Sequence, residues 1–199
     1  YTMDESDLIQ EDEAPFQTGS ASVAVNSELS SGSGDANKIA YHLPAMGGLT
    51  AGISHTDASA AGGSDTTAMG ARYSMDAGGA AITLAYATST TENSTQDIDS
   101  DNMAVKIVSG DISMIISQGD YEANDEDISN MGASVSYKMS DTMTVAAYTF
   151  DSEDDLDAGE EYSRSGVELL YTIASGLTAA INIDDYDYKA GTSQTSVSD

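Results

Sequence analysis

The sequence predicts an all-β protein, an antiparallel up-and-down β-barrel that spans a membrane. Three observations predict it: strict period-2 alternation of apolar with small polar residues, strands of roughly nine to eleven residues, and connections that alternate between tight turns and long acidic loops. Strands of that length cross a hydrocarbon layer when they are tilted, whereas strands of soluble proteins average about five or six residues.

The alternation is clearest in the middle of the chain. In 80–89, Ile82, Leu84 and Tyr86 alternate with small or hydroxylated residues, and in 101–109 Val105 and Ile107 do the same. Applied along the chain, the period predicts ten strands at 36–43, 49–57, 66–75, 80–89, 101–109, 111–121, 130–139, 142–151, 162–173 and 177–188.

Two kinds of connection separate these strands. The short connections are rich in Gly, Asp and Ser, as hairpin turns are, and lie at 44–48, 75–79, 109–111, 140–142 and 174–176. The long connections carry most of the acidic residues and lie at 57–65, 89–101, 120–130, 151–161 and from 184 to the end. Each predicted hairpin therefore has one tight end and one long acidic end.

Composition excludes several classes of function. The 199 residues include 34 acids and 6 bases, a formal net charge of −28, which repels phosphate backbones and excludes nucleic acid as a partner. The absence of cysteine excludes disulfides and thiolate sites. The sequence has neither an 18-residue apolar run nor a signal peptide, and its start, Tyr-Thr-Met-Asp-Glu, leads us to expect a mature or internal fragment.

Alternation alone does not decide which face meets water, because a soluble sandwich and a transmembrane barrel share it. The second face is rich in Ser, Thr, Gly and Ala and has few of the long charged side chains that cover soluble sheets. Tyrosines on the apolar parity lie near the short turns, as in an interfacial girdle. The basic residues that share the polar parity are Lys38, Arg72, Lys106, Lys138 and Arg164. Together these features favour a barrel with an apolar exterior.

Several segments resemble one family. The strand-turn-strand from Asn37 to Ser54, and the segments 131–137 and 165–171, resemble the trimeric general porins of Gram-negative bacteria, especially the alphaproteobacterial kind. The resemblance covers most of 35–188. It implies a homotrimer in the outer membrane, a barrel of about sixteen strands, and a water-filled channel for passive diffusion of ions and small hydrophilic solutes, with no enzymatic activity. Since the sequence shows fewer strands and no final aromatic strand, we expect strands to be missing at both ends.

The resemblance also implies a single barrel domain over 1–199, with a constriction-loop region at 1–35, strands at 36–188 and part of a long loop at 189–199. The acids of the constriction loop would be Asp4, Glu5, Asp7, Glu11, Asp12 and Glu13. The basic wall opposite this loop would be Lys38, Arg72, Lys106 and Arg164, and opposed charges across a narrow aqueous gap favour polar solutes. The acidic loops predict a preference for cations. The alternative for 4–13 is an acidic, solvated loop without a role in the pore.

Three other hypotheses compete. A loop that holds Asp151, Glu153, Asp154, Asp155 and Asp157 offers oxygen ligands for Ca²⁺ or Mg²⁺, but its spacing matches no EF-hand, so weak screening is expected and no cofactor. A soluble, calcium-screened surface adhesin of β-sandwich or β-solenoid type is the alternative function. A barrel enzyme built on His55 and Asp57 is the third hypothesis, disfavoured because no second acidic partner stands at a matching strand end.

Overall fold

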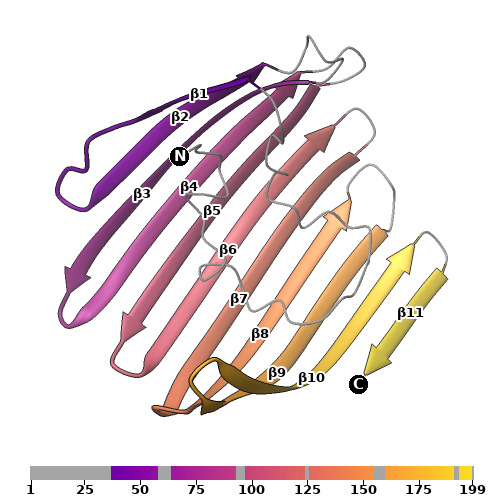
Figure 1. Ribbon diagram of the computed structural model, residues 1–199. Helices are drawn as coiled ribbons and strands as arrows, with labels where there is room; N and C mark the ends of the chain where they lie inside the picture. The colour runs from indigo at the N-terminus through magenta and orange to yellow at the C-terminus, as the bar shows by residue number, and fades with distance from the viewer. Residues whose placement is uncertain are drawn as a thin grey trace.

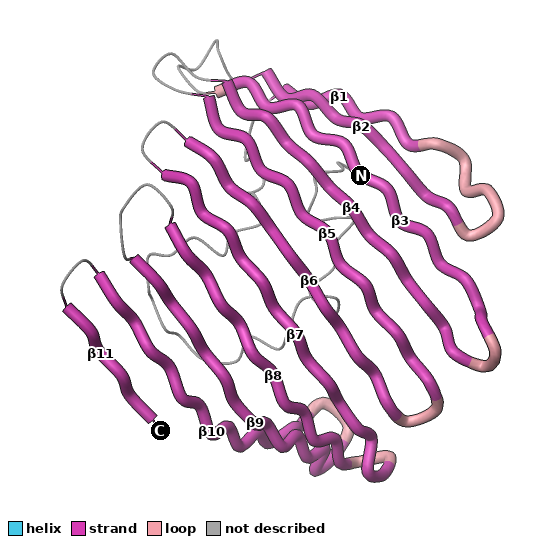
Figure 2. The backbone as a smooth tube through the Cα atoms, turned by 180° about the vertical axis from the view of Figure 1, so that it is seen from behind, coloured by secondary structure: helices cyan, strands magenta, loops and turns pink. Residues whose placement is uncertain are grey.

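The computed structural model describes residues 37–57, 64–92, 97–123, 126–154, 160–190 and 193–198. Within these ranges the chain forms one sheet of eleven strands, each paired antiparallel with its neighbours in sequence. Figure 1 shows the strands side by side in chain order in a curved sheet, and Figure 2 shows the sheet from behind. The strands are β1 (Asn37–His42), β2 (Leu49–Asp57), β3 (Asp65–Ala77), β4 (Ala80–Glu92), β5 (Asp97–Ser109), β6 (Ile112–Ala123), β7 (Glu126–Ser140), β8 (Met143–Asp154), β9 (Glu160–Ala174), β10 (Leu177–Ala190) and β11 (Ser193–Ser198). No helix in the described ranges is long and apolar enough to cross a membrane.

The strand order confirms the predicted up-and-down meander. All ten predicted strands are present, and most are longer than predicted, reaching 15 residues in β7 and β9. The extra residues are mostly acidic or hydroxylated ones at the loop ends; Glu92, for example, pairs with Asp97. Ladder hydrogen bonds are made by the backbone, so a charged side chain that points into water does not end a strand.

The prediction for the end of the chain was wrong. Residues 189–199, predicted to be part of a long loop, contain the end of β10 and an additional strand, β11, which pairs with β10 from Asp185↔Ser198 to Ala190↔Ser193. The sequence Ser-Gln-Thr-Ser-Val-Ser has no apolar alternation. It forms a strand because the exposed edge of β10 offers backbone partners, which side-chain periodicity does not report.

Four of the five short connections are tight turns built on glycine, whereas the turn at 140–142 between β7 and β8 contains none. Gly78 and Gly79 have φ values of +62° and +91°, as expected for the two central residues of a type I′ hairpin turn. Gly48 has φ +89°, and a Cβ at this position would lie 2.1 Å from the carbonyl oxygen of Ser74. The turn between β1 and β2 therefore requires glycine for two reasons: its backbone conformation and the close approach of β3.

The two faces of the sheet differ in chemistry and in exposure. We call the face that carries Leu84 and Tyr86 the exterior face, and the face that carries Ala85 and Ala87 the interior face. Leu84 is 40% exposed and Ala87 is fully buried, although a soluble sheet would bury the leucine. Exposed large apolar side chains follow the exterior face across the sheet, at Ile39, Ile53, Met69, Val105, Ile116, Val135, Val167, Ile181 and Ile183. The predicted inversion of the two faces is confirmed.

This exterior apolar band crosses the hydrogen-bonded rows obliquely. Its loop-side boundary lies between His55 and Ile53 on β2, and between Asp185 and Ile183 on β10. The row that contains Ile53 reaches β10 at Lys189, six residues closer to the loops than Ile183. A drift of about 20 Å over eight strand spacings of about 4.8 Å corresponds to strands inclined by roughly 30° to the normal of the band. Barrel strands have a similar inclination.

A pair of glycine substitutions tests the turn between β1 and β2. Gly48→Ala should destabilise the protein by clearly more than Gly47→Ala, because both positions have positive φ but only position 48 meets the backbone of Ser74. The left-handed conformation alone costs about 1–2 kcal/mol, which is the effect expected for Gly47→Ala. Urea unfolding of the full-length protein in detergent measures the difference; equal losses of stability would contradict the assigned contact.

Candidate functional site

The interior face is a wall of small and hydroxylated side chains. One row across it reads Gly52, Gly70, Ala87, Asn102 and Gly119. A Cβ at position 119 would lie 2.3 Å from Oδ1 of Asn102, so glycine there leaves room for the amide on the neighbouring strand. Hydrogen bonds along the wall include Asn102 Nδ2 to Ser100 Oγ at 3.2 Å and Ser152 Oγ to Asn130 Oδ1 at 2.9 Å. Such a surface suits contact with water rather than with hydrocarbon.

The predicted basic residues occupy interior-face positions at different places on this wall. Arg72 lies on β3, Lys106 on β5 and Arg164 on β9, all partly buried, and Lys38 pairs with Thr56 at the loop end of β1. Arg72 and Arg164 share one hydrogen-bonded row. The row is oblique to the apolar band, so Arg72 lies within the span of the band and Arg164 lies on its loop side.

The interior face also carries different charges on its two sides, a difference that was not predicted from the sequence. Among the described side chains of β1–β6, Asp76 beside the β3–β4 turn is the one interior-face acid. The interior-face acids with described side chains on β8–β10 are Asp154, Glu160, Glu168 and Asp184. Arg164 lies within this acidic part, and its Nη2 is 2.9 Å from Oδ2 of Asp184. The parity of Asp184 and the β9–β10 register are the signals that could have identified it.

A group of aromatic side chains lies on the interior face towards the loops. Tyr162 is buried together with Ile128, and Tyr121, Phe150, Tyr186 and Tyr188 pack against them. The Tyr162 ring centroid lies 6.1 Å from that of Phe150 and 6.4 Å from that of Tyr186. These residues have the same parity as Arg164, whereas the tyrosine girdle predicted from the sequence has the apolar parity. Phe150, Tyr162 and Tyr186 lie on β8, β9 and β10, so the aromatic group overlaps the acidic part of the wall.

Lys138 has a different position from the other bases. Its Nζ is 2.8 Å from Oδ1 of Asp141 in the turn after β7, and both side chains are well exposed. This hydrogen bond, together with the nearby positive charge, lowers the pKa of Asp141. Lys138 therefore belongs to the turn end of the sheet, as its place in the sequence predicts.

The predicted constriction acids lie outside the described residues. Asp4, Glu5, Asp7, Glu11, Asp12 and Glu13 all precede Asn37, the first residue that the structure describes. That these acids face the interior wall across a narrow gap therefore stays a prediction.

The acids proposed for weak Ca²⁺ binding do not come together where they are described. Asp151 and Glu153 lie on the exterior face of β8, whereas Asp154 lies on the interior face, where its Oδ1 accepts a hydrogen bond of 3.3 Å from the backbone N–H of Asp127. An extended strand sends successive side chains to opposite faces, so these three cannot share one ion. Asp155 and Asp157 are not among the described residues. No group of three or more His, Asp or Glu in the described ranges could hold a metal ion.

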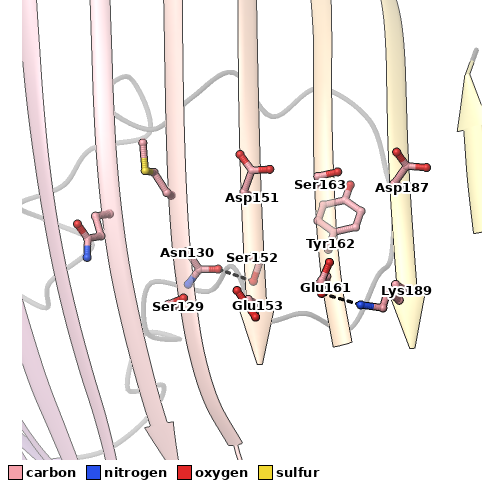
Figure 3. Close-up of a pocket in the computed structure, with 12 residues that line it drawn as sticks. Ser129, Asn130, Asp151, Ser152, Glu153, Glu161, Tyr162, Ser163, Asp187 and Lys189 are labelled. Atoms are coloured by element: carbon pink, nitrogen blue, oxygen red, sulfur yellow. Dashed lines mark hydrogen bonds and ion pairs between the residues drawn. The ribbon is translucent and has the colours of Figure 1, made fainter. Parts of the chain in front are cut away.

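Figure 3 shows the loop end of β7–β10, where an open cavity of about 510 Å³ is lined mostly by polar and charged side chains. Glu161 and Lys189 form an ion pair of 2.7 Å there, on the exterior face. Asp151, Glu153 and Asp187 lie on the same face, on the loop side of the apolar band. The exterior face therefore changes from apolar to charged where the band ends.

The two histidines lie on opposite faces. His42 is at an interior-face position at the turn end of β1. His55 is exposed on the exterior face of β2, and its Nδ1 is 3.0 Å from Oγ1 of Thr67 on β3. Asp57 is also on the exterior face. His55 and Asp57 thus lie on the outside of the sheet, away from the interior wall.

Comparison with known proteins agrees with this architecture. The sequence matches the family model of the Gram-negative porins over residues 2–191, and it matches no curated protein significantly. The fold is similar to that of Acinetobacter baumannii OccAB4, with a TM-score of 0.65, 10% identity, and coverage of 80% of this chain and 50% of that chain. Pseudomonas aeruginosa OccK5 (OpdH) is similar with a TM-score of 0.64 and 12% identity, and the match covers 80% of this chain and 54% of that chain. The anion-selective porin of Comamonas acidovorans is similar with a TM-score of 0.58 and 17% identity, and the match covers 81% of this chain and 57% of that chain.

These structural similarities, at low identity, establish the fold, which is that of β-barrel porins. The chain spans about half the length of the solved structures that it matches. Porins are channels and not enzymes. Because they lie in the outer membrane, the exterior apolar band is the surface that faces lipid. The match over residues 2–191, together with the inverted faces of the sheet, shows that this chain belongs to the Gram-negative porin family.

Proposed function

We propose that the interior face lines a water-filled channel for the passive diffusion of ions and small hydrophilic solutes across the outer membrane, with a preference for cations. The observation that carries the proposal is the inversion of the sheet: small polar residues inside, and apolar side chains such as Ile183, 66% exposed, outside. A soluble adhesin would gather those apolar side chains in a dry core, so this observation counts against the alternative function.

The preference for cations rests on charge. The net charge of −28 is concentrated in the loops and loop ends, where it attracts cations to the mouth of the channel. The acids of the interior wall on β8–β10 add to this effect inside. The anion-selective porin of Comamonas acidovorans has a similar fold, so we assign selectivity to the side chains of the wall rather than to the barrel.

Arg72 and Lys106 are the bases we assign to the narrow part of the channel, because both lie within the span of the apolar band. In this proposal Asp4, Glu5, Asp7, Glu11, Asp12 and Glu13 oppose them from a constriction loop, and Lys38 and Arg164 lie nearer the loop-side mouth. The segment 1–199 then forms one barrel domain with strands contributed by the rest of the protein. Assembly as a homotrimer, and weak screening of the acidic loops by Ca²⁺ or Mg²⁺, complete the proposal; diffusion itself needs no cofactor.

Conductance measurements test the channel and its selectivity separately. The full-length protein in a planar bilayer should give discrete conductance steps, and under a salt gradient its reversal potential should have the sign of cation preference. Absence of steps would overturn the channel, whereas steps with anion preference would overturn only the selectivity.

Removing one base from the narrow part tests the basic wall. Lys106→Gln should raise the cation-to-anion permeability ratio by about two- to fivefold, the effect of one unit charge at about 8 Å in water. Lys138→Gln removes the same charge at the turn end, where Lys138 already pairs with Asp141, and should change the ratio much less. Equal ratios for the two variants would show that Lys106 has no special position.

A charge on the exterior face tests contact with lipid. Val105→Arg places a cation within the apolar band and should cost about 2–4 kcal/mol, whereas Thr88→Arg, on the loop side of the band on β4, should cost about 0–1 kcal/mol. Unfolding of the full-length protein in lipid vesicles measures both. Similar costs at the two positions would exclude a hydrocarbon environment around Val105.

A further inference from the structure

Side chains from three neighbouring strands join on the interior face of β8–β10. Tyr148, Gly166 and Asp184 lie side by side in one row, with the glycine in the middle. The Tyr148 hydroxyl donates a hydrogen bond to Oδ1 of Asp184, so the phenol crosses the whole width of β9. A Cβ at position 166 would lie 2.7 Å from that hydroxyl and 2.3 Å from Oδ1 of Asp184. Glycine at 166 is therefore what allows the side chains of β8 and β10 to meet.

Arg164 completes this group. Its Nη2 donates to Oδ2 of Asp184 at 2.9 Å, and its guanidinium carbon lies 5.6 Å from the centroid of the Tyr148 ring. Tyr148 and Arg164 thus donate to different oxygens of the Asp184 carboxylate. The guanidinium is held by the carboxylate on one side and by the ring face on the other. We call Tyr148, Arg164, Gly166 and Asp184 the β8–β10 cluster.

The cluster neutralises the one base in the acidic part of the wall. The Arg164 and Asp184 side chains are only 12% and 19% exposed, so their mutual attraction is less screened than in a surface pair. A passing ion at a distance larger than 2.9 Å meets a dipole instead of an isolated positive charge, and the field of a dipole decreases faster with distance. Arg164 therefore attracts anions much less than an isolated base at that position would.

We infer that Asp184 is a selectivity-determining residue of the channel and that Tyr148 and Gly166 position it. This inference rests on the proposed channel function. Without Asp184, the Arg164 guanidinium would lose its ion pair with this carboxylate, on the loop side of the apolar band where solutes enter. With it, the loop end of the interior wall on β8–β10 keeps its excess of acids, Asp154 and Glu160, and this side of the mouth favours cations.

The test compares two adjacent residues of β10. Asp184→Asn and Asp185→Asn each remove one negative charge from the full-length protein, but Asp184 lies on the interior face and Asp185 on the exterior face. In planar bilayers under a salt gradient, Asp184→Asn should lower the cation-to-anion permeability ratio by about two- to fivefold, and Asp185→Asn should leave it nearly unchanged. Equal reversal potentials for the two variants would overturn the inference.

A charge-neutralisation series separates a selectivity role from a merely structural one. Arg164→Gln should move the ratio in the opposite direction, towards cations, and the double variant Arg164→Gln with Asp184→Asn should return close to the wild type. A structural brace between β9 and β10 would change stability in all three variants without these opposite shifts, and that result would refute the inference. Should Asp184→Asn fail to fold, the Arg164→Gln and double variants decide the question by themselves.

The failure of the inference is distinct from the failure of the proposed function. A wild-type protein without conductance steps would remove the channel. Conductance steps in all variants with one common reversal potential would keep the channel and remove only the role of Asp184.

Discussion

The structure depends on one constraint, that backbone N–H and C=O groups in hydrocarbon must find their partners within the protein. In this chain every described strand except those at the two sheet edges has hydrogen-bonded neighbours on both sides, and all the neighbours are consecutive in sequence. Because the ladder satisfies the backbone, the side chains of the exterior face can be entirely apolar within the band. Since successive side chains of a strand point to opposite faces, the other face of the same sheet carries the small polar side chains of the interior wall.

Because the apolar band is oblique to the hydrogen-bonded rows, interior residues of one row lie at different depths in the membrane. Residues in one hydrogen-bonded row are neighbours across the sheet, but the row climbs relative to the membrane, so Arg72 and Arg164 lie at different depths. A list of basic residues with the correct parity therefore does not define a ring in the channel. Depth depends on strand inclination, a property of the whole sheet.

Charge on the wall is arranged across the sheet as well as along the strands. Arg72 and Lys106 lie on β3 and β5, and the acids of β8–β10 compensate Arg164 through Asp184. Two porins that share this fold can therefore differ in selectivity through a few interior side chains. This agrees with a barrel as a common scaffold whose function is decided by the residues of its wall.

Ten of the eleven described strands, the short turns and the face on which each strand residue lies follow from the sequence, because period-2 alternation and turn residues are local properties. The pattern predicts Ile82, Leu84 and Val105 on the lipid-facing side and Gly78-Gly79 in a hairpin turn, and the structure has them there. Three features needed the tertiary structure: the addition of β11 to the edge of β10, the extension of β8 through Asp154, and the pairing of Arg164 with Asp184 over Gly166. The physical reason is that register and strand inclination join residues about 20 positions apart, as with Arg164 and Asp184, and alternation within one strand contains no information about them.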